Sequence, residues 1–234
     1  MKPIEKALLL RKSAHLRSKE PMRVFQNRMR EPERLLKLAE QQPLAQRTRQ
    51  EARRQYLVCV CAAFEAYWRE FVRVNIDRRI IPERTIERLK GLTFTLADVH
   101  RILGRELTLG ELISCSYSFQ GLDAVNVALS EILQIRLFSQ FGDARFLVRE
   151  EPRKNRSSQE PLIESHITGK HILKSTCPAI ARCFAIRHET VHDTGTRYRV
   201  STREAHRIAH ATWEFNMFLG MHLEHWFEKQ WRCR

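Results

Sequence analysis

The chain has 234 residues, of which 43% are hydrophobic and 29% are charged, and its formal net charge is +14. This length supports one hydrophobic core, and the small numbers of glycine and proline, eight each, favour an all-α fold over a turn-rich β fold. Because the sequence contains no apolar run long enough to cross a membrane and no recognisable signal peptide, we expect a cytoplasmic protein.

The excess of positive charge indicates the kind of partner rather than the fold. A surface of this charge attracts polyanions, and nucleic acid is the commonest polyanion in a cell. Two alternatives stay open: the protein is simply basic, or an acidic partner subunit balances its charge.

The first 43 residues are rich in Arg, Lys and Glu and are predicted to form a basic N-terminal helical arm over residues 1–43. We expect one or two exposed helices here, interrupted near Pro21 and Pro32. Such an arm either grips a partner or is a solvated charged helix. The rest of the chain, residues 44–234, is the predicted helical domain.

The helical domain begins with a core helix over residues 44–79, which Pro82 ends. Apolar residues recur in this segment at steps of three and four, which is the spacing of one helix face. They are Tyr56, Val60, Ala63, Phe64, Tyr67, Phe71 and Val74. This face is predicted to lie in the core.

Capping boxes mark three helix starts farther along the chain, because a Ser or Thr precedes an acidic residue by three positions. The pairs are Thr95 and Asp98, Thr108 and Glu111, and Ser201 and Glu204. Between them we predict an amphipathic helix over residues 122–138, a short strand over 146–148 and a polar surface loop over 149–160.

Two helices complete the predicted fold. One covers residues 178–193 and is ended by Gly195, and a long C-terminal helix covers residues 201–231. The apolar residues of the last helix have the spacing of a packed face, with stacking on bases as an alternative for its aromatic members. They are Ile208, Ala211, Phe215, Phe218, Leu219 and Trp226.

The six cysteines include no C-x-x-C pair, which argues against the usual zinc and thioredoxin sites. We therefore expect free thiols in a reducing cytosol.

The segment 181–195, with the sequence ARCFAIRHETVHDTG, contains the candidate functional residues and allows two competing interpretations. The first is a zinc site, because the run HETVH from His188 to His192 matches H-E-x-x-H. The two histidines would share a helix face and hold the ion, and Glu189 would activate a bound water. The longer metalloprotease motif is incomplete, since Tyr198 stands in place of its third histidine. The remaining candidates for a third ligand are Glu204 and Glu214.

The second interpretation is phosphate chemistry around Arg187. Helical spacing places this residue in the middle of an apolar stripe, where a buried guanidinium needs a carboxylate partner or a cleft that receives an anion. The stripe consists of Ile180, Phe184, Arg187 and Val191, and the opposite, solvated face carries Arg182 and Glu189. His188 and His192 lie at the border between the two faces. RNA cleavage needs a group that moves the 2′-OH proton and a cation that stabilises the phosphorus centre.

A purely structural role for these residues is a third possibility. A histidine near a helix C-terminus often complements the helix dipole. Arg187 would in that case simply pair with an acid such as Glu65.

The motif resembles the R-x4-H signature of the HEPN superfamily, in particular the RiboL-PSP-type subgroup with R-H-x-x-V-H. Arg187 matches the arginine of that motif, His192 matches its histidine, and His188 matches the polar residue after the arginine. The segments 58–72 and 122–138 are similar to the early core helix and the middle of that subgroup. The resemblance covers residues 44–231 and implies a HEPN-like helical bundle with an N-terminal arm and a long C-terminal helix.

This resemblance implies a metal-independent endoribonuclease without a cofactor, in which two copies bring their motif helices to one shared cleft. Arg187 would stabilise the phosphorane, and His192 would act as general acid or base. His188 would position the phosphate or His192, and Glu65 would orient Arg187. The implied partners are RNA, a second copy and an antitoxin or regulatory protein of a toxin or defence system. Because Thr194 replaces the tyrosine that a nucleotidyltransferase modifies in some HEPN toxins, that form of regulation is not expected. A non-catalytic HEPN module that binds RNA or a partner stays open as the alternative.

Overall fold

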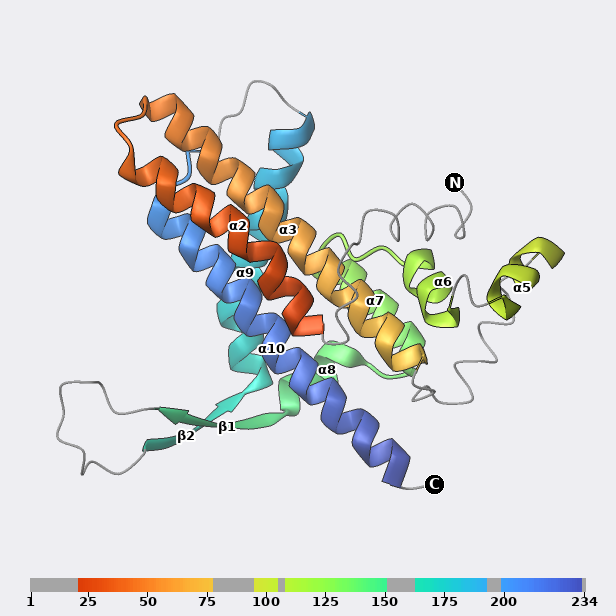
Figure 1. Cartoon of the computed structure of the whole chain (residues 1–234). Helices are drawn as coiled ribbons and strands as arrows, with labels where there is room; N and C mark the ends of the chain where they lie inside the picture. The colour runs from red at the N-terminus through yellow and green to blue at the C-terminus, as the bar shows by residue number, and fades with distance from the viewer. Residues whose placement is uncertain (1–20, 78–94, 105–107, 151–162, 193–198, 233–234) are drawn as a thin grey trace.

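The structure is a computed structural model that describes residues 21–77, 95–104, 108–150, 163–192 and 199–232. Within these ranges the protein is a bundle of eight helices with one two-stranded sheet, which confirms the predicted all-α class (Figure 1). The elements are α2 (Pro21–Gln41), α3 (Gln46–Asp77), α5 (Leu96–Leu103), α6 (Leu109–Ser116), α7 (Leu122–Leu133), α8 (Leu137–Asp143), β1 (Arg145–Glu150), β2 (Ile163–Thr168), α9 (Gly169–His192) and α10 (Thr202–Arg232). None of the described helices is long and apolar enough to span a membrane.

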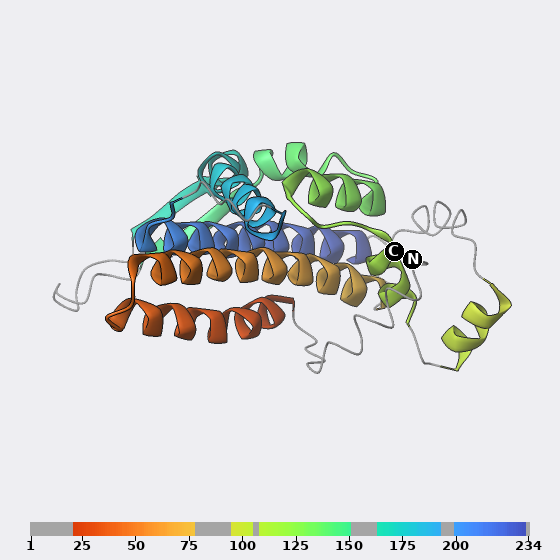
Figure 2. The ribbon, with the colours of Figure 1, turned by 90° about the horizontal axis from the view of Figure 1, so that it is seen from above.

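The helices are arranged in three layers, which Figure 2 shows from above. The long helices α3 and α10 lie side by side in the middle, α2 covers one side of α3, and α9 with α7 covers the other side. Large aromatic rings fill the core between them: Trp68 lies 6.1 Å from Phe215 and 5.6 Å from Phe71, measured between ring centroids. The edge-on contact of Trp68 with Phe215 joins α3 to α10, and its contact with Phe71 lies within α3.

The predicted core faces of α3 and α10 are confirmed. All seven apolar residues predicted on the face of α3 are buried. In α10 the five residues from Ile208 to Leu219 that were predicted on its packed face are buried as well, and Trp226 is partly buried against the core. Packing therefore occupies Phe215 and Phe218, and base stacking by these two rings is excluded.

The prediction of exposed helices interrupted at Pro32 is wrong for the described part of the N-terminal segment. The helix α2 continues through Pro32 and packs antiparallel on α3, with Phe25, Met29 and Leu36 buried in the core. Pro32 lies on a half-buried turn, and the apolar face on both sides of it supplies more packing than the missing backbone hydrogen bond removes. Residues 1–20, with the first half of the predicted arm, lie outside the described ranges.

A buried polar cluster joins α2, α3 and the start of α10. Arg53 of α3 is 7% exposed and donates two hydrogen bonds to the carboxylate of Glu40, at 2.7 and 2.9 Å. Its guanidinium also donates to the backbone carbonyl of Val200, at 3.3 Å. The hydrogen bond from Arg53 holds the pKa of Glu40 below its usual range. The contact between Arg53 and Glu40 therefore contributes most stability while Glu40 is ionised.

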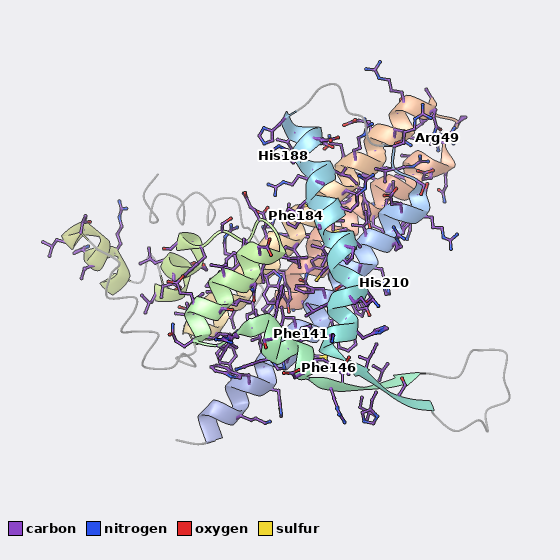
Figure 3. All side chains as sticks on the ribbon, turned by 180° about the vertical axis from the view of Figure 1, so that it is seen from behind. Arg49, Phe141, Phe146, Phe184, His188 and His210 are labelled. Atoms are coloured by element: carbon purple, nitrogen blue, oxygen red, sulfur yellow. The ribbon has the colours of Figure 1, made fainter. Side chains whose placement is uncertain are left out.

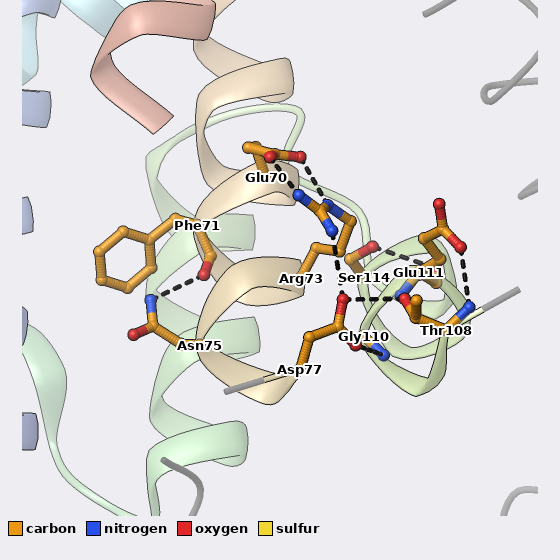
Figure 4. Close-up of polar contacts among 9 residues, drawn as sticks. All are labelled: Glu70, Phe71, Arg73, Asn75, Asp77, Thr108, Gly110, Glu111 and Ser114. Carbon is orange, nitrogen blue, oxygen red and sulfur yellow. Dashed lines mark hydrogen bonds and ion pairs between the residues drawn. The ribbon is translucent and has the colours of Figure 1, made fainter. Parts of the chain in front are cut away.

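The short helix α6 is anchored at the end of α3, as Figure 4 shows. Asp77 accepts hydrogen bonds from the backbone N–H of Gly110 and from the hydroxyl of Thr108, each at 2.9 Å. A Cβ atom on Gly110 would lie 2.3 Å from the carbonyl oxygen of Arg73, so this close approach requires glycine. Thr108 and Glu111 form both hydrogen bonds of the predicted capping box, which is confirmed.

The other two predicted capping boxes have different outcomes. The hydroxyl of Ser201 accepts a hydrogen bond from the backbone N–H of Glu204 at 3.1 Å, which is half of the predicted box. The carboxylate of Glu204 pairs instead with Arg182 of α9, at 3.4 Å. The third predicted box, at Thr95, is not described, because the side chain of Asp98 lies outside the described residues. The predicted helix ends at Pro82 and Gly195 also lie outside them.

The predicted helix over 122–138 is divided into α7 and α8. Gln134 has φ 56°, and its left-handed conformation ends α7 at Leu133.

The predicted strand 146–148 lies inside β1, but residues 149 and 150, which were predicted to belong to the loop, are also part of β1. The partner strand β2 was not predicted; it pairs antiparallel with β1, with Phe146 opposite Ile167. Figure 1 shows this hairpin extending from the bundle beside α8.

The start of α9 also differs from the prediction, because the helix begins at Gly169 and contains Pro178 in its interior. A Cβ atom on Gly169 would lie 1.7 Å from the carbonyl oxygen of Phe141, so glycine allows α9 to begin directly against α8. The apolar residues along the first turns of α9 then pack on the core, which keeps the helix intact through Pro178.

Candidate functional site

The motif residues lie at the C-terminal end of α9, where this helix crosses α3. Figure 3 labels His188 near this end, far from the hairpin. The buried face of α9 consists of Ile172, Thr176, Ile180, Cys183 and Ile186. Arg187 directly follows the last residue of this face, and His188 and His192 occupy the next, exposed face. The helix therefore holds Arg187 at the edge of the core and presents both imidazoles to solvent.

Two details of the predicted helix faces are wrong. Val191, expected on the apolar stripe, is 58% exposed, because the packed face ends at Ile186. Arg182 and Glu189, expected on a solvated face, are both half-buried. Arg182 contacts α10 through its ion pair with Glu204, and the Oε2 atom of Glu189 is buried without a hydrogen-bond partner among the described residues. The face toward α10 is therefore covered, which periodicity within one helix does not reveal.

Arg187 forms a short ion pair with Glu65 of α3, in which its Nη1 donates to Oε1 of the carboxylate. The side chain of Arg187 is 28% exposed and that of Glu65 is 13% exposed. In this half-buried setting an ion pair is stronger than on the surface, because water screens it less. The contact confirms the predicted pairing of Arg187 with Glu65, and it fixes the direction in which the guanidinium points.

His188 and His192 form a second pair on the same face of α9. Their ring centroids are 4.8 Å apart and the ring planes are inclined by 45°. Both residues are exposed, and neither imidazole is joined by a hydrogen bond to another of the described residues. Two exposed imidazoles this close to each other can accept, donate and exchange protons with a bound ligand.

The structure brings together these two pairs but does not bring Arg187 into contact with His192. Positions five residues apart on an α-helix are separated by about 140° around the axis and about 7.5 Å along it. The guanidinium points to α3 and the imidazole of His192 points to solvent. One copy of the chain therefore presents the cation and the histidine on different sides of the same helix end.

The zinc interpretation retains two of its ligands and lacks a third among the residues that the structure describes. His188 and His192 share a face, as the H-E-x-x-H pattern requires. The two acids considered as third ligand are engaged elsewhere: Glu204 pairs with Arg182 at 3.4 Å, and Glu214 lies 4.0 Å from His210. In the described part of the chain no group of three or more His, Cys, Asp or Glu side chains is arranged to hold a metal ion. A catalytic zinc site needs three protein ligands, so these residues do not fit one.

A pair of cysteines lies one helical turn from the Glu65–Arg187 pair and was missed in the sequence. The Sγ atoms of Cys61 and Cys183 are 3.4 Å apart, and both residues are buried. The hydrogen bond with Cys61, together with burial, raises the pKa of Cys183 well above its usual value, so the Cys183 thiol stays protonated. The two side chains pack α3 against α9. The signal was present in the sequence, since each cysteine precedes its ion-pair residue by four positions. The five described cysteines are free thiols, as expected.

Comparison with known proteins adds no assignment to these residues. No protein-family model, no curated protein and no solved structure matches this chain. The residues and geometry of the site are therefore the basis on which its function is inferred.

Proposed function

We propose that this protein cleaves RNA without a metal ion, as a HEPN-type endoribonuclease in which Arg187 and His192 act. One observation carries the proposal: a half-buried arginine is held in place by a carboxylate at the same helix end as two exposed histidines that have no hydrogen-bond partner among the described residues. The net charge of +14 supports a polyanionic substrate.

These residue types supply what RNA cleavage by its own 2′-hydroxyl requires. A neutral histidine takes the 2′-OH proton while the 2′-oxygen bonds to phosphorus. The bond from phosphorus to the 5′-oxygen breaks, and a protonated histidine delivers a proton to that leaving oxygen. The guanidinium of Arg187 stabilises the negative charge that grows on the phosphoryl oxygens. The products are a 2′,3′-cyclic phosphate and a 5′-hydroxyl.

The arrangement within one copy supports a site shared by two copies. Arg187 and His192 lie on different sides of the end of α9, and the two steps above need one histidine as base and another as acid. A symmetric dimer that places two α9 ends side by side supplies two arginines and two histidines to one phosphodiester. In this proposal His188 positions the phosphate or His192, Glu65 positions Arg187, and an antitoxin or regulatory protein would act on the dimer in the cytoplasm.

The test is cleavage of an end-labelled RNA by the purified full chain in the presence of EDTA. The wild type is expected to leave cyclic phosphate ends, and His192→Ala and Arg187→Ala are expected to lose this activity while keeping the circular dichroism spectrum of the wild type. The matched control is His171→Ala, which removes an exposed histidine from the other end of the same helix and is expected to cleave normally. Cleavage that survives both motif substitutions would refute the proposal.

The ion pair with Glu65 favours a second candidate function, a non-catalytic module that binds RNA or a partner. The carboxylate of Glu65 neutralises the positive charge of Arg187 and thereby weakens its ability to stabilise negative charge on a phosphoryl group. Steeply salt-dependent RNA binding without cleavage by the wild type would select this second function.

A further inference from the structure

The two exposed histidines at the C-terminal end of α9 have the geometry of a metal chelate. His188 and His192 are one helical turn apart, and their ring centroids lie 4.8 Å from each other. The centroid of an imidazole ring lies about 3.2 Å from an ion that its nitrogen binds, because the bond from nitrogen to zinc is about 2.0 Å long and the ring radius adds about 1.2 Å. Two such rings on one ion, at the angles of square or tetrahedral coordination, are therefore about 4.5 to 5.2 Å apart. The observed separation lies within this range.

A second pair of histidines, on α10, shows that sequence spacing alone does not produce this arrangement. His206 and His210 are also four positions apart, and both are exposed. The ring of His206 lies 6.0 Å from that of Tyr56, measured between centroids. The ring of His210 lies 5.9 Å from that of Trp213, and its Nδ1 atom lies 4.0 Å from Glu214. The α10 histidines therefore face other side chains, whereas the α9 histidines face each other; Figure 3 labels one member of each pair.

The chemistry of two imidazoles selects the class of ion. Neutral imidazole nitrogens bind Zn²⁺, Ni²⁺ and Cu²⁺, whereas Mg²⁺ and Ca²⁺ prefer oxygen ligands. Neither imidazole of the α9 pair is joined by a hydrogen bond to another described residue, so coordination breaks no such contact. Within the part of the chain that the structure describes, no third His, Cys, Asp or Glu is placed to join the two, so water would complete the coordination. Because a net charge of +14 repels cations, the affinity would come from coordination rather than from charge.

We infer that His188 and His192 chelate one late first-row divalent ion, such as Zn²⁺ or Ni²⁺, and that this ion inhibits the protein. The inhibition rests on the proposed function, in which His192 acts as general acid or base. A coordinated imidazole nitrogen has no free lone pair to accept the 2′-OH proton, and it carries no proton to give to the 5′-oxygen. The ion-bound protein is therefore inactive, and removal of the ion restores both imidazoles.

The first experiment measures ion binding without RNA, by isothermal titration calorimetry of the untagged full chain with Ni²⁺. The wild type is expected to bind Ni²⁺ and to give no binding heat with Mg²⁺. His188→Ala is expected to lower the affinity for Ni²⁺ about tenfold or more, since loss of even a hydrogen-bond partner of a metal ligand costs about 10- to 100-fold. The matched control is His206→Ala, which removes an exposed histidine of the same spacing and is expected to bind like the wild type. Equal affinities of the two variants would overturn the inference.

The second experiment adds Ni²⁺ to the cleavage of a trace amount of end-labelled RNA in buffer without EDTA. The wild type and His206→Ala are both expected to lose cleavage, with half-maximal inhibition near the dissociation constant from calorimetry, and to regain it in excess EDTA. The same concentration of Mg²⁺ is expected to leave cleavage unchanged, which separates coordination by imidazoles from binding of cations to the RNA. Unchanged or faster cleavage by the Ni²⁺-loaded wild type would overturn the inferred inhibition.

The outcomes separate this inference from the proposed cleavage. A wild type that binds Ni²⁺ through His188 and never cuts RNA would support the chelate and refute the nuclease. A wild type that cuts RNA in EDTA, together with a His188→Ala variant that binds Ni²⁺ like His206→Ala, would support the nuclease and refute the chelate.

Discussion

The ion pair between Glu65 and Arg187 allows a quantitative test of how the site is built. Replacement Glu65→Gln keeps the shape of the side chain and removes its charge, which leaves the guanidinium of Arg187 half-buried with only a neutral partner. Exposed ion pairs are worth less than about 1 kcal/mol, whereas breaking a fully buried pair costs about 3 to 5 kcal/mol. With exposures of 28% and 13%, this pair lies between the two cases, so we expect a loss of about 2 kcal/mol.

Urea unfolding monitored by circular dichroism measures this loss. With a slope m of about 2.5 kcal/mol per molar urea, the expected loss lowers the unfolding midpoint by about 0.8 M. A double-mutant cycle with Glu65→Gln, Arg187→Gln and the double variant then isolates the interaction itself. The expected coupling energy is about 1 kcal/mol or more, because removing the second partner costs little once the first is gone.

A second ion pair of α9 serves as the matched comparison. Arg182 and Glu204 also join two helices, but they are 3.4 Å apart and their side chains are 32% and 22% exposed. Their coupling energy in the same cycle is expected to be smaller than that of Glu65 and Arg187. A coupling energy below about 0.5 kcal/mol between Glu65 and Arg187 would lie within the error of additivity and refute the reasoning that Glu65 holds Arg187 in place.

Two further predictions concern the fold that supports the site. Gly169→Ala places a methyl group against the carbonyl oxygen of Phe141 and is expected to destabilise the protein by about 3 kcal/mol. Gly142→Ala is the control and is expected to be neutral or stabilising, because a Cβ atom there would have no neighbour within 4 Å. Equal thermal unfolding temperatures for the two variants would contradict this prediction. The lowered pKa of Glu40 means that its ion pair with Arg53 contributes stability above the pKa of the unfolded chain and loses it as the pH falls through the lower pKa of the folded protein. Glu40→Gln is therefore expected to flatten the acid side of the stability profile, below the pKa of a carboxyl in the unfolded chain, and an unchanged profile would speak against the pair.

Much of the helical architecture follows from local sequence signals. The three- and four-residue spacing of apolar side chains in α3 and α10 predicted which faces enter the core, because helix geometry places such positions on one side. The capping box at Thr108 predicted a helix start to the residue, because it depends on side chains and backbone groups only three positions apart.

The errors have a common physical origin, which is packing between segments distant in the sequence. Local rules place a helix start at Pro178, yet contacts of the preceding turns with the core carry α9 through it. The strand β2 has no strong pattern of its own and exists through its pairing with β1. In both cases long-range contacts outweigh local propensity.

The candidate site was also predicted in part from local sequence and decided in part by packing between helices. The sequence by itself determined that an arginine and two histidines share the end of one helix, because positions one, four and five residues apart have a set geometry on an α-helix. Only the tertiary structure decided that Arg187 turns to Glu65 and that Arg53 binds Glu40, because each of these contacts joins two helices. Their relative rotation depends on how the side chains between them pack, and no periodicity within a single helix contains that information.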